Sequence, residues 1–149
     1  MNLSTSVKIT PAILPSEGVA GTTDIEGAIV SLSGFEGLLA AVTFGVITAT
    51  AVTSVKLQGG IEANLSDAAD IANTEITVLD TDDDKTFYID LFRPLSDYPY
   101  VRVVVDRGTA NAVVASATYM QYGFGGARKM PTTHADGVSG TLAVSPELE

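Results

Sequence analysis

Residues 37–46 read Gly-Leu-Leu-Ala-Ala-Val-Thr-Phe-Gly-Val, and this stretch decides the class of fold. Every even position from Leu38 to Val46 is apolar, whereas the odd positions include Thr43 and Gly45. Apolar residues at every second position are typical of a β-strand with one buried face. Residues 37–55 carry no charge, a length close to that of a membrane span. Because threonines, a central glycine and β-branched residues favour strands over a helix, we expect no membrane segment.

The same period of two recurs along the rest of the chain. Residues 64–72 differ, because Ser66 or Asp67 could cap one or two helical turns in an alanine-containing segment. The turn residues 106–111 separate the last two strands closely enough to predict an antiparallel hairpin. We expect a connection at 48–51, a breaker at 58–60, and strands near 54–57, 74–79, 86–92, 101–105 and 112–122.

Recurring strands without a long helical period predict an all-β fold, either an antiparallel β-sandwich or a jelly-roll-like barrel. We expect the sandwich domain to span residues 28–122. The flanks, 1–27 and 123–149, are rich in Gly and Pro and predict an extended N-terminal arm and C-terminal tail. Unstructured termini are the alternative. Three tail residues are apolar enough to need a partner surface: Val138, Leu142 and Val144.

Composition excludes several classes of chemistry. The 149 residues include no Cys and one His, so we expect neither a disulfide framework nor a zinc site. Eighteen acidic and eight basic residues give a net charge of −10, which disfavours binding to nucleic acid. The first eight residues lack the apolar core of a secretory signal, and we expect none.

The charge is unevenly spread. Residues 85–130 have a net charge of +3, residues 1–84 of −10 and residues 131–149 of −3. One interpretation is complementary contact between copies or with a larger partner. The other is that these charges lie on solvated strand faces, since a sequence segment does not map onto a surface patch.

The densest acidic cluster spans Asp80 to Asp84. Alternating carboxylates resemble the start of a calcium loop, but Lys85 and Leu91 stand where such a loop needs Gly and Glu. Asp also favours turns through local hydrogen bonds, so we expect a solvated turn between two strands.

Other candidate sites are weak. His134 is the only imidazole available to a Ser-His-Asp relay, and it lies with Asp136 in the tail, a poor platform for catalysis. Residues 122–129 mix Gly with bases but lack the spacing of a phosphate loop, and predict an exit from the last strand. Residues 93–100 form either an interface or a rigid loop packed on its own core. We therefore expect no catalytic, cofactor-binding or metal-binding residues.

The order of these segments resembles capsid decoration (cement) proteins of tailed bacteriophages. The resemblance covers most of residues 30–133. It rests on Gly34-Phe35-Glu36-Gly37 before the long strand, the Asp/Ala segment 67–72, Phe87 to Pro94, Tyr100 to Val105, Arg107 to Val113 and Lys129 to Thr133.

The resemblance implies a non-enzymatic virion protein on the capsid exterior, assembled in the host cytoplasm. Its partners would be the major capsid protein and further copies of itself, as a trimer or dimer, without nucleic acid, membrane or cofactor. A head–tail or tail structural role could use the same domain. A carbohydrate-binding β-sandwich is the alternative, with Tyr88, Tyr98 and Tyr100 as exposed aromatics. The lone His134 argues against a small hydrolase.

Overall fold

The computed structural model describes residues 2–92, 94, 97–123 and 134–144. One short 3-10 turn, η1 (Leu3–Thr5), precedes the strands. The strands are β1 (Val7–Ile13), β2 (Ile25–Glu26), β3 (Val30–Ser31), β4 (Gly37–Ile47), β5 (Val52–Gly60), β6 (Ala69–Asp70), β7 (Ile76–Val78), β8 (Thr86–Phe92), β9 (Tyr100–Gly108) and β10 (Ala112–Tyr122).

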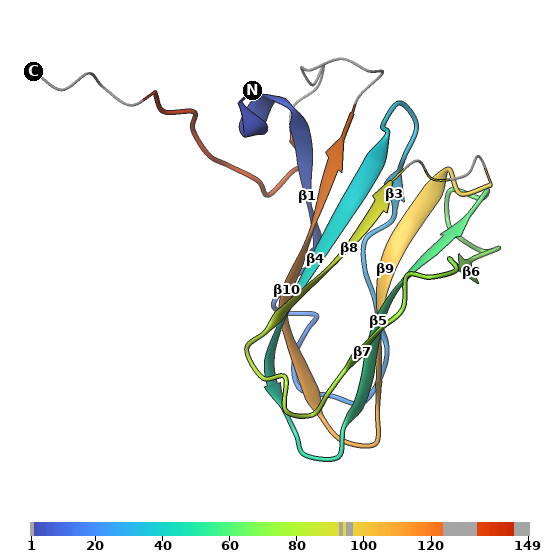
Figure 1. Ribbon diagram of the computed structural model, residues 1–149, viewed down its shortest axis with the longest axis vertical. Helices are drawn as coiled ribbons and strands as arrows, with labels where there is room; N and C mark the ends of the chain where they lie inside the picture. The colour runs from blue at the N-terminus through green and yellow to red at the C-terminus, as the bar shows by residue number, and fades with distance from the viewer. Residues whose placement is uncertain (1, 93, 95–96, 124–133, 145–149) are drawn as a thin grey trace, which may run out of the picture.

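The strands form two antiparallel sheets that pack face to face, as Figure 1 shows. Sheet A has the order β1-β10-β4-β8. Sheet B has the order β2-β9-β5-β6, with β3 also pairing with β9 and β7 with β5. The all-β antiparallel sandwich predicted from the sequence is confirmed. The described residues contain no helix long and apolar enough to cross a membrane, and the stretch weighed for that role forms β4 and the start of β5.

The core lies where the inner faces of the two sheets meet. On β4 the even residues from Leu38 to Phe44 are buried, as their period predicts. Val46, which the same period places inside, is exposed, because the β4–β10 register shifts between Phe44 and Ile47. The buried residues meet Val55 and Leu57 of β5 and the alternating valines of β9. The rings of Phe44 and Phe87 pack in a T-shaped arrangement, with ring centroids 5.7 Å apart. This alternation buries one face of each sheet and leaves the other exposed.

Two local predictions are wrong. Residues 66–72 form turns and the short strand β6 instead of a helix. Asp67 does not cap a following helix; its carboxylate accepts the backbone N–H groups of Ile61 and Glu62, at 2.8 and 3.2 Å, and so closes a turn backwards. The expected breaker at 58–60 is part of β5, where Gly59 leaves room for the ring of Tyr98.

The predicted hairpin of the last two strands is also wrong. β9 pairs with β5 in sheet B, whereas β10 pairs with β1 and β4 in sheet A. The connection at 109–111 therefore crosses between the sheets. A short Gly-containing loop indicates that the chain reverses, but not that the two strands share hydrogen bonds.

Residues 7–26 lie within the sandwich, although the sequence predicts an arm over residues 1–27. β1 pairs with β10 along its length, and β2 pairs with β9. Arg107 holds the segment between them, because its buried guanidinium donates to the carbonyls of Val19, Thr23 and Ala112 at 2.7–2.8 Å. The start of the sandwich is thus near residue 7, not residue 28.

The C-terminal tail is described in part. Residues 134–144 contain no strand, and in Figure 1 they leave the β1 edge and extend away from the sandwich. Most of the predicted exit segment, 124–129, lies outside the described residues.

Tyr119 joins the two sheets through a buried hydroxyl. On β10 of sheet A, this hydroxyl accepts the N–H of Val103 on β9 at 2.7 Å and donates to the carbonyl of Ala28 at 2.8 Å. Burial raises the pKa of the phenol, so it stays neutral and can donate.

We predict that Tyr119→Phe lowers the free energy of unfolding by about 1–3 kcal/mol, because the buried N–H of Val103 and the partly buried carbonyl of Ala28 lose their partner. Urea unfolding measures the change. The matched control is Tyr88→Phe, which removes the hydroxyl of an exposed tyrosine and is expected to change stability by less than about 0.5 kcal/mol. Equal effects of the two variants would contradict the assigned role.

Candidate interaction surfaces

The outer face of sheet A is almost uncharged and combines apolar side chains with a few hydroxyls. Cross-strand partners share a face, so the registers define its rows. One row holds Ile9, Met120, Leu39 and Asp90, in strand order. The remaining rows are Val7–Tyr122–Gly37–Phe92, Pro11–Thr118–Ala41–Tyr88 and Ser116–Thr43–Thr86. Asp90 is the one charged side chain in these rows.

Tyr122 hydrogen-bonds to Asp90, whose side chain stays exposed. Its ring lies over Gly37, where a larger residue would collide with it, and its hydroxyl donates to the Asp90 carboxylate. Burial raises the pKa of the phenol, and the hydrogen bond to Asp90 raises it further. The pair therefore remains a neutral phenol bound to a carboxylate, which reduces the polarity of the face.

Two large aromatic side chains flank Asp90 on the same edge strand. Tyr88 is 66 % exposed and Phe92 is 56 % exposed. Both belong to β8 and point outward with Asp90, as alternate residues of one strand do. Together with Tyr122 they give the outer face of sheet A an aromatic rim.

The outer face of sheet B carries a polar network instead. Arg102 on β9 makes a bidentate pair with Glu26 on β2, with both N···O distances 2.9 Å, and also donates to Gln58. Gln58 in turn donates to Asp70, whose other oxygen accepts from Lys56 at 2.9 Å. The hydrogen bond from Lys56 lowers the pKa of Asp70 and raises that of Lys56. The two faces of the sandwich are thus chemically different.

The three basic residues of region 85–130 that the structure describes, Lys85, Arg102 and Arg107, have partners within the molecule. Arg102 binds Glu26, and Arg107 binds backbone carbonyls. Of the two interpretations of the uneven charge, the described residues favour solvated faces with internal pairing.

The acidic turn at residues 80–84 is held by its own carboxylates. Asp80 accepts the N–H of Thr50 at 2.8 Å, and Asp83 accepts that of Ile47 at 2.6 Å. Asp82 accepts from the Lys85 ammonium and the Leu79 N–H, and the Lys85 contact is the main cause of its lowered pKa. The carboxylates therefore point at different partners. No group of three acidic or His side chains in the described part of the chain could hold a metal ion.

His134 pairs with the free edge of β1. Its Nδ1 accepts the N–H of Ile9 at 3.1 Å, and the next N–H, of Ala135, donates to the Ile9 carbonyl at 3.2 Å. The imidazole thus acts as a backbone partner at a sheet edge. Ser4 and Ser139 line the same small pocket, but no hydrogen bond joins either hydroxyl to His134 among the described contacts.

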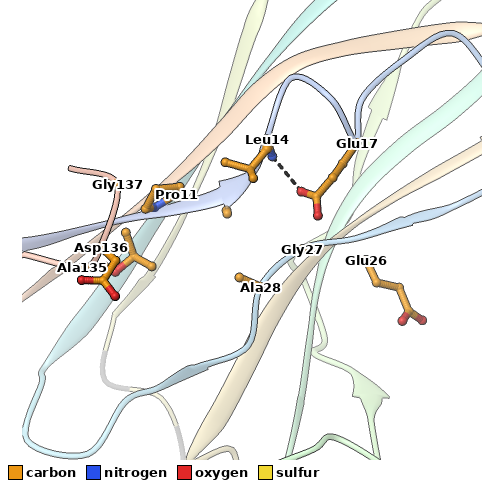
Figure 2. Close-up of a pocket in the computed structure, with 11 residues that line it drawn as sticks. Pro11, Leu14, Glu17, Glu26, Gly27, Ala28, Ala135, Asp136 and Gly137 are labelled. Carbon is orange, nitrogen blue, oxygen red and sulfur yellow. Dashed lines mark hydrogen bonds between the residues drawn. The ribbon is translucent and has the colours of Figure 1, made fainter.

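A cavity of about 600 Å³ opens between β1 and the turn of the tail at residues 135–137 (Figure 2). Its walls are mostly apolar, with Pro11, Leu14 and Ala28 among them. The carboxylate of Glu17 accepts the N–H of Leu14 at 2.8 Å, and Glu26 points away, towards sheet B, where it binds Arg102. The acidic side chains do not converge on a common point.

The three tyrosines considered for a carbohydrate site do not come together. Tyr88 lies on sheet A, whereas Tyr100 belongs to β9 of sheet B and is half-buried. Tyr98 packs against the core beside Gly59. Within the described part of the 93–100 loop, this contact favours a loop packed on its own core. The sequence analysis did not identify Tyr122 and Phe92 as surface aromatics. They share a face with Tyr88 only because of the strand register of sheet A.

Comparisons with known proteins do not assign the chain to a family. No family model matches the chain, and no curated protein matches it. Two solved structures are similar in outline. A xylan-binding module, CBM15, is 8 % identical with a TM-score of 0.44 over 81 % of this chain and 94 % of that chain. PirA is 13 % identical with a TM-score of 0.36 over 78 % of this chain and 93 % of that chain.

The carboxyl groups of Asp24 and Asp106 lie close together at sheet B, and their repulsion makes stability depend on pH. Burial raises the pKa of Asp106, and the neighbouring Asp24 raises it further. A carboxyl whose pKa is higher in the folded state costs stability at neutral pH, and this cost disappears as the pH falls below the unfolded value.

We predict that Asp106→Asn raises the melting temperature at pH 7 by about 1–3 °C, the scale of one exposed charge interaction, and leaves it unchanged at about pH 3. Thermal scans across this range measure both values. The control is Glu62→Gln, which removes an exposed carboxylate elsewhere. A loss of stability at pH 7 in Asp106→Asn would contradict the repulsion.

Proposed function

We propose that this chain is a non-enzymatic structural protein of a tailed-bacteriophage virion that binds the outer surface of the capsid and stabilises it. The observation that carries the proposal is the outer face of sheet A. In a chain of net charge −10, its paired rows contain one charge, Asp90, which is exposed and accepts a hydrogen bond from Tyr122. A sheet face with little charge and with exposed aromatic side chains, here Tyr88 and Phe92, is typical of protein interfaces.

The major capsid protein is the proposed partner, because the order of segments over residues 30–133 resembles decoration proteins. Sheet B, with its network from Glu26 to Lys56, would face solvent. Small contacts repeated over a symmetric lattice add avidity, so each contact can be weak. The chain would act as a dimer or trimer on the virion exterior after assembly in the host cytoplasm.

We predict that the double variant Leu39→Lys/Met120→Lys reduces capsid occupancy at least about tenfold, because two desolvated charges cost more than the 1.4 kcal/mol that this factor represents. The control is Ser54→Lys/Thr77→Lys, which places the same charges on a paired row of sheet B. Co-sedimentation with capsids built from the major capsid gene of the same genome measures occupancy. Unchanged occupancy in the sheet A variant would refute docking through this face.

We further predict that deleting residues 131–149 weakens particle attachment or heat tolerance and leaves the sandwich folded. Apart from the edge contacts of His134 and Ala135, the described part of this segment adds little to the sandwich. Circular dichroism checks the fold, and heating of decorated particles checks stability. Particles with full occupancy and unchanged heat tolerance would refute a role for the tail.

Carbohydrate binding is the second candidate, and one observation favours it. Tyr88 and Phe92 expose flat aromatic faces on either side of the Asp90 carboxylate, an arrangement that suits stacking and hydrogen bonding to a sugar. A glycan-array screen tests it, with Tyr88→Thr as the variant expected to lose any signal. Binding to glycans with no binding to capsids would favour this candidate over the first.

A further inference from the structure

The outer edge of β8 is the one long sheet edge that the described residues leave unprotected. Sandwiches avoid edge-to-edge pairing by short, interrupted or covered edge strands. In sheet B the outer strands β2, β3, β6 and β7 have only two or three residues each. In sheet A, β1 contains Pro11, and His134 and Ala135 occupy its edge. β8 has seven residues and none of these devices.

The backbone of β8 presents free pairing positions at Tyr88 and Asp90. The N–H of Phe44 donates to the carbonyl of Lys85 at 2.9 Å, so these two residues form a hydrogen-bonded pair in the β4–β8 register. Hydrogen-bonded pairs alternate along an antiparallel ladder, so Phe87 and Ile89 also bond to β4. The N–H and carbonyl groups of Tyr88 and Asp90 therefore point away from β4, towards the edge.

The composition of β8 suits it to accept another strand. Residues 86–92 read Thr-Phe-Tyr-Ile-Asp-Leu-Phe, with one charge and neither Pro nor Gly. β-Branched and aromatic residues with little charge are the composition that favours strand pairing between chains.

A matching strand is present in the tail. Residues 138–144 read Val-Ser-Gly-Thr-Leu-Ala-Val, which alternates with period two and has no charge. In the structure they form no strand, and Leu142 is 52 % exposed and Val144 85 % exposed. The segment starts at the β1 edge of sheet A, where Val138 to Leu142 line a small pocket with Ser4 and Ile9. Its end extends away from the sandwich, and β10 and β4 lie between the β1 edge and β8 (Figure 1). It is therefore placed to reach a neighbouring copy.

We propose that residues 138–144 of one copy add as an antiparallel strand to the outer edge of β8 of a second copy. The two segments have equal length, and every strand pair that the structure describes is antiparallel. Full overlap pairs Leu142 with Tyr88 and Gly140 with Asp90. This register extends the apolar outer face of sheet A and leaves room beside the Asp90–Tyr122 pair. His134 and Ala135 already form hydrogen bonds to the edge of β1 in the same chain, so the start of the tail pairs with a strand edge in the structure itself.

The contact is head-to-tail, so two copies can close it reciprocally and three can close it as a ring. It does not require a capsid, and it can fail while capsid binding succeeds. The test is sedimentation velocity of the full chain over a range of concentrations. We expect concentration-dependent association to a dimer or trimer.

Two variants remove the two halves of the contact. Tyr88→Pro removes an N–H that points to the free edge, a position where an edge strand tolerates Pro, and Tyr88→Thr is the control that keeps the N–H. Leu142→Asp/Val144→Asp places charges in the added strand, and Leu142→Ile/Val144→Ile is its control. Each disruptive variant is expected to weaken association at least about tenfold, or 1.4 kcal/mol, and each control to associate like the natural chain.

Mixing the two disruptive variants tests the head-to-tail geometry. One retains its tail and the other its edge, so the mixture is expected to form 1:1 dimers that grow no further. If Tyr88→Pro does not fold, the tail variants still test the proposal, because Leu142 and Val144 lie outside the sandwich.

The register can be tested independently, because the natural chain has no Cys. Tyr88→Cys mixed with Leu142→Cys is expected to form an intermolecular disulfide on oxidation, since paired residues in a ladder lie about 5.5 Å apart. Thr86→Cys mixed with Leu142→Cys, one pair out of register, is expected to form much less. A monomer at all concentrations, or association unaffected by both disruptive variants, would overturn the proposal.

Discussion

The hydroxyl of Tyr119 lies between the two sheets, and their relative position depends on it. It connects the centre of sheet A to Val103 at the centre of sheet B and to the Ala28 carbonyl in the segment between β2 and β3. Gly27 leaves room for this contact, since a side chain there would lie 2.7 Å from Val103. Apolar contacts hold the sheets together without fixing one alignment, whereas a buried hydroxyl with two partners is satisfied in only one. Gln121, two residues along β10, adds a second such contact to the Ser31 carbonyl.

This alignment determines which residues reach the surface. With the even residues of β4 buried against sheet B, the odd residues of the same strand lie on the outer face of sheet A. There Leu39 and Ala41 join Met120 and Pro11 of the neighbouring strands. In sheet B the same alternation places Lys56 and Arg102 outside, where they pair with acids. One core arrangement thus yields an apolar face and a charged face on opposite sides.

Local patterns in the sequence predicted the strands but not their partners. The alternation in β4, β8 and β9 depends on each strand's own neighbours, so a single sequence reveals it. The separation of β9 and β10 into different sheets depends on contacts with β5 and β4, far away in the chain. Arg107 was interpreted as a turn residue from its neighbours in the sequence. Its hydrogen bonds to the carbonyls of Val19 and Thr23 depend on residues far away in the chain, so no local pattern reveals them. The aromatic rim of sheet A was missed for the same reason, since Tyr122 meets Asp90 only across β4.

The net charge of −10 constrains where copies of this chain can touch. Like charges oppose association, so a contact between copies must use surfaces where charge is scarce or neutralised. The acidic turn at residues 80–84 does not qualify, although its carboxylates bind backbone groups. The outer face of sheet A, the edge of β8 and the tail from Val138 to Val144 do qualify. These three regions adjoin once a tail pairs with β8, because the added strand continues the same face. An acidic chain without a catalytic constellation among its described residues thus concentrates its uncharged surface where a neighbour can extend it.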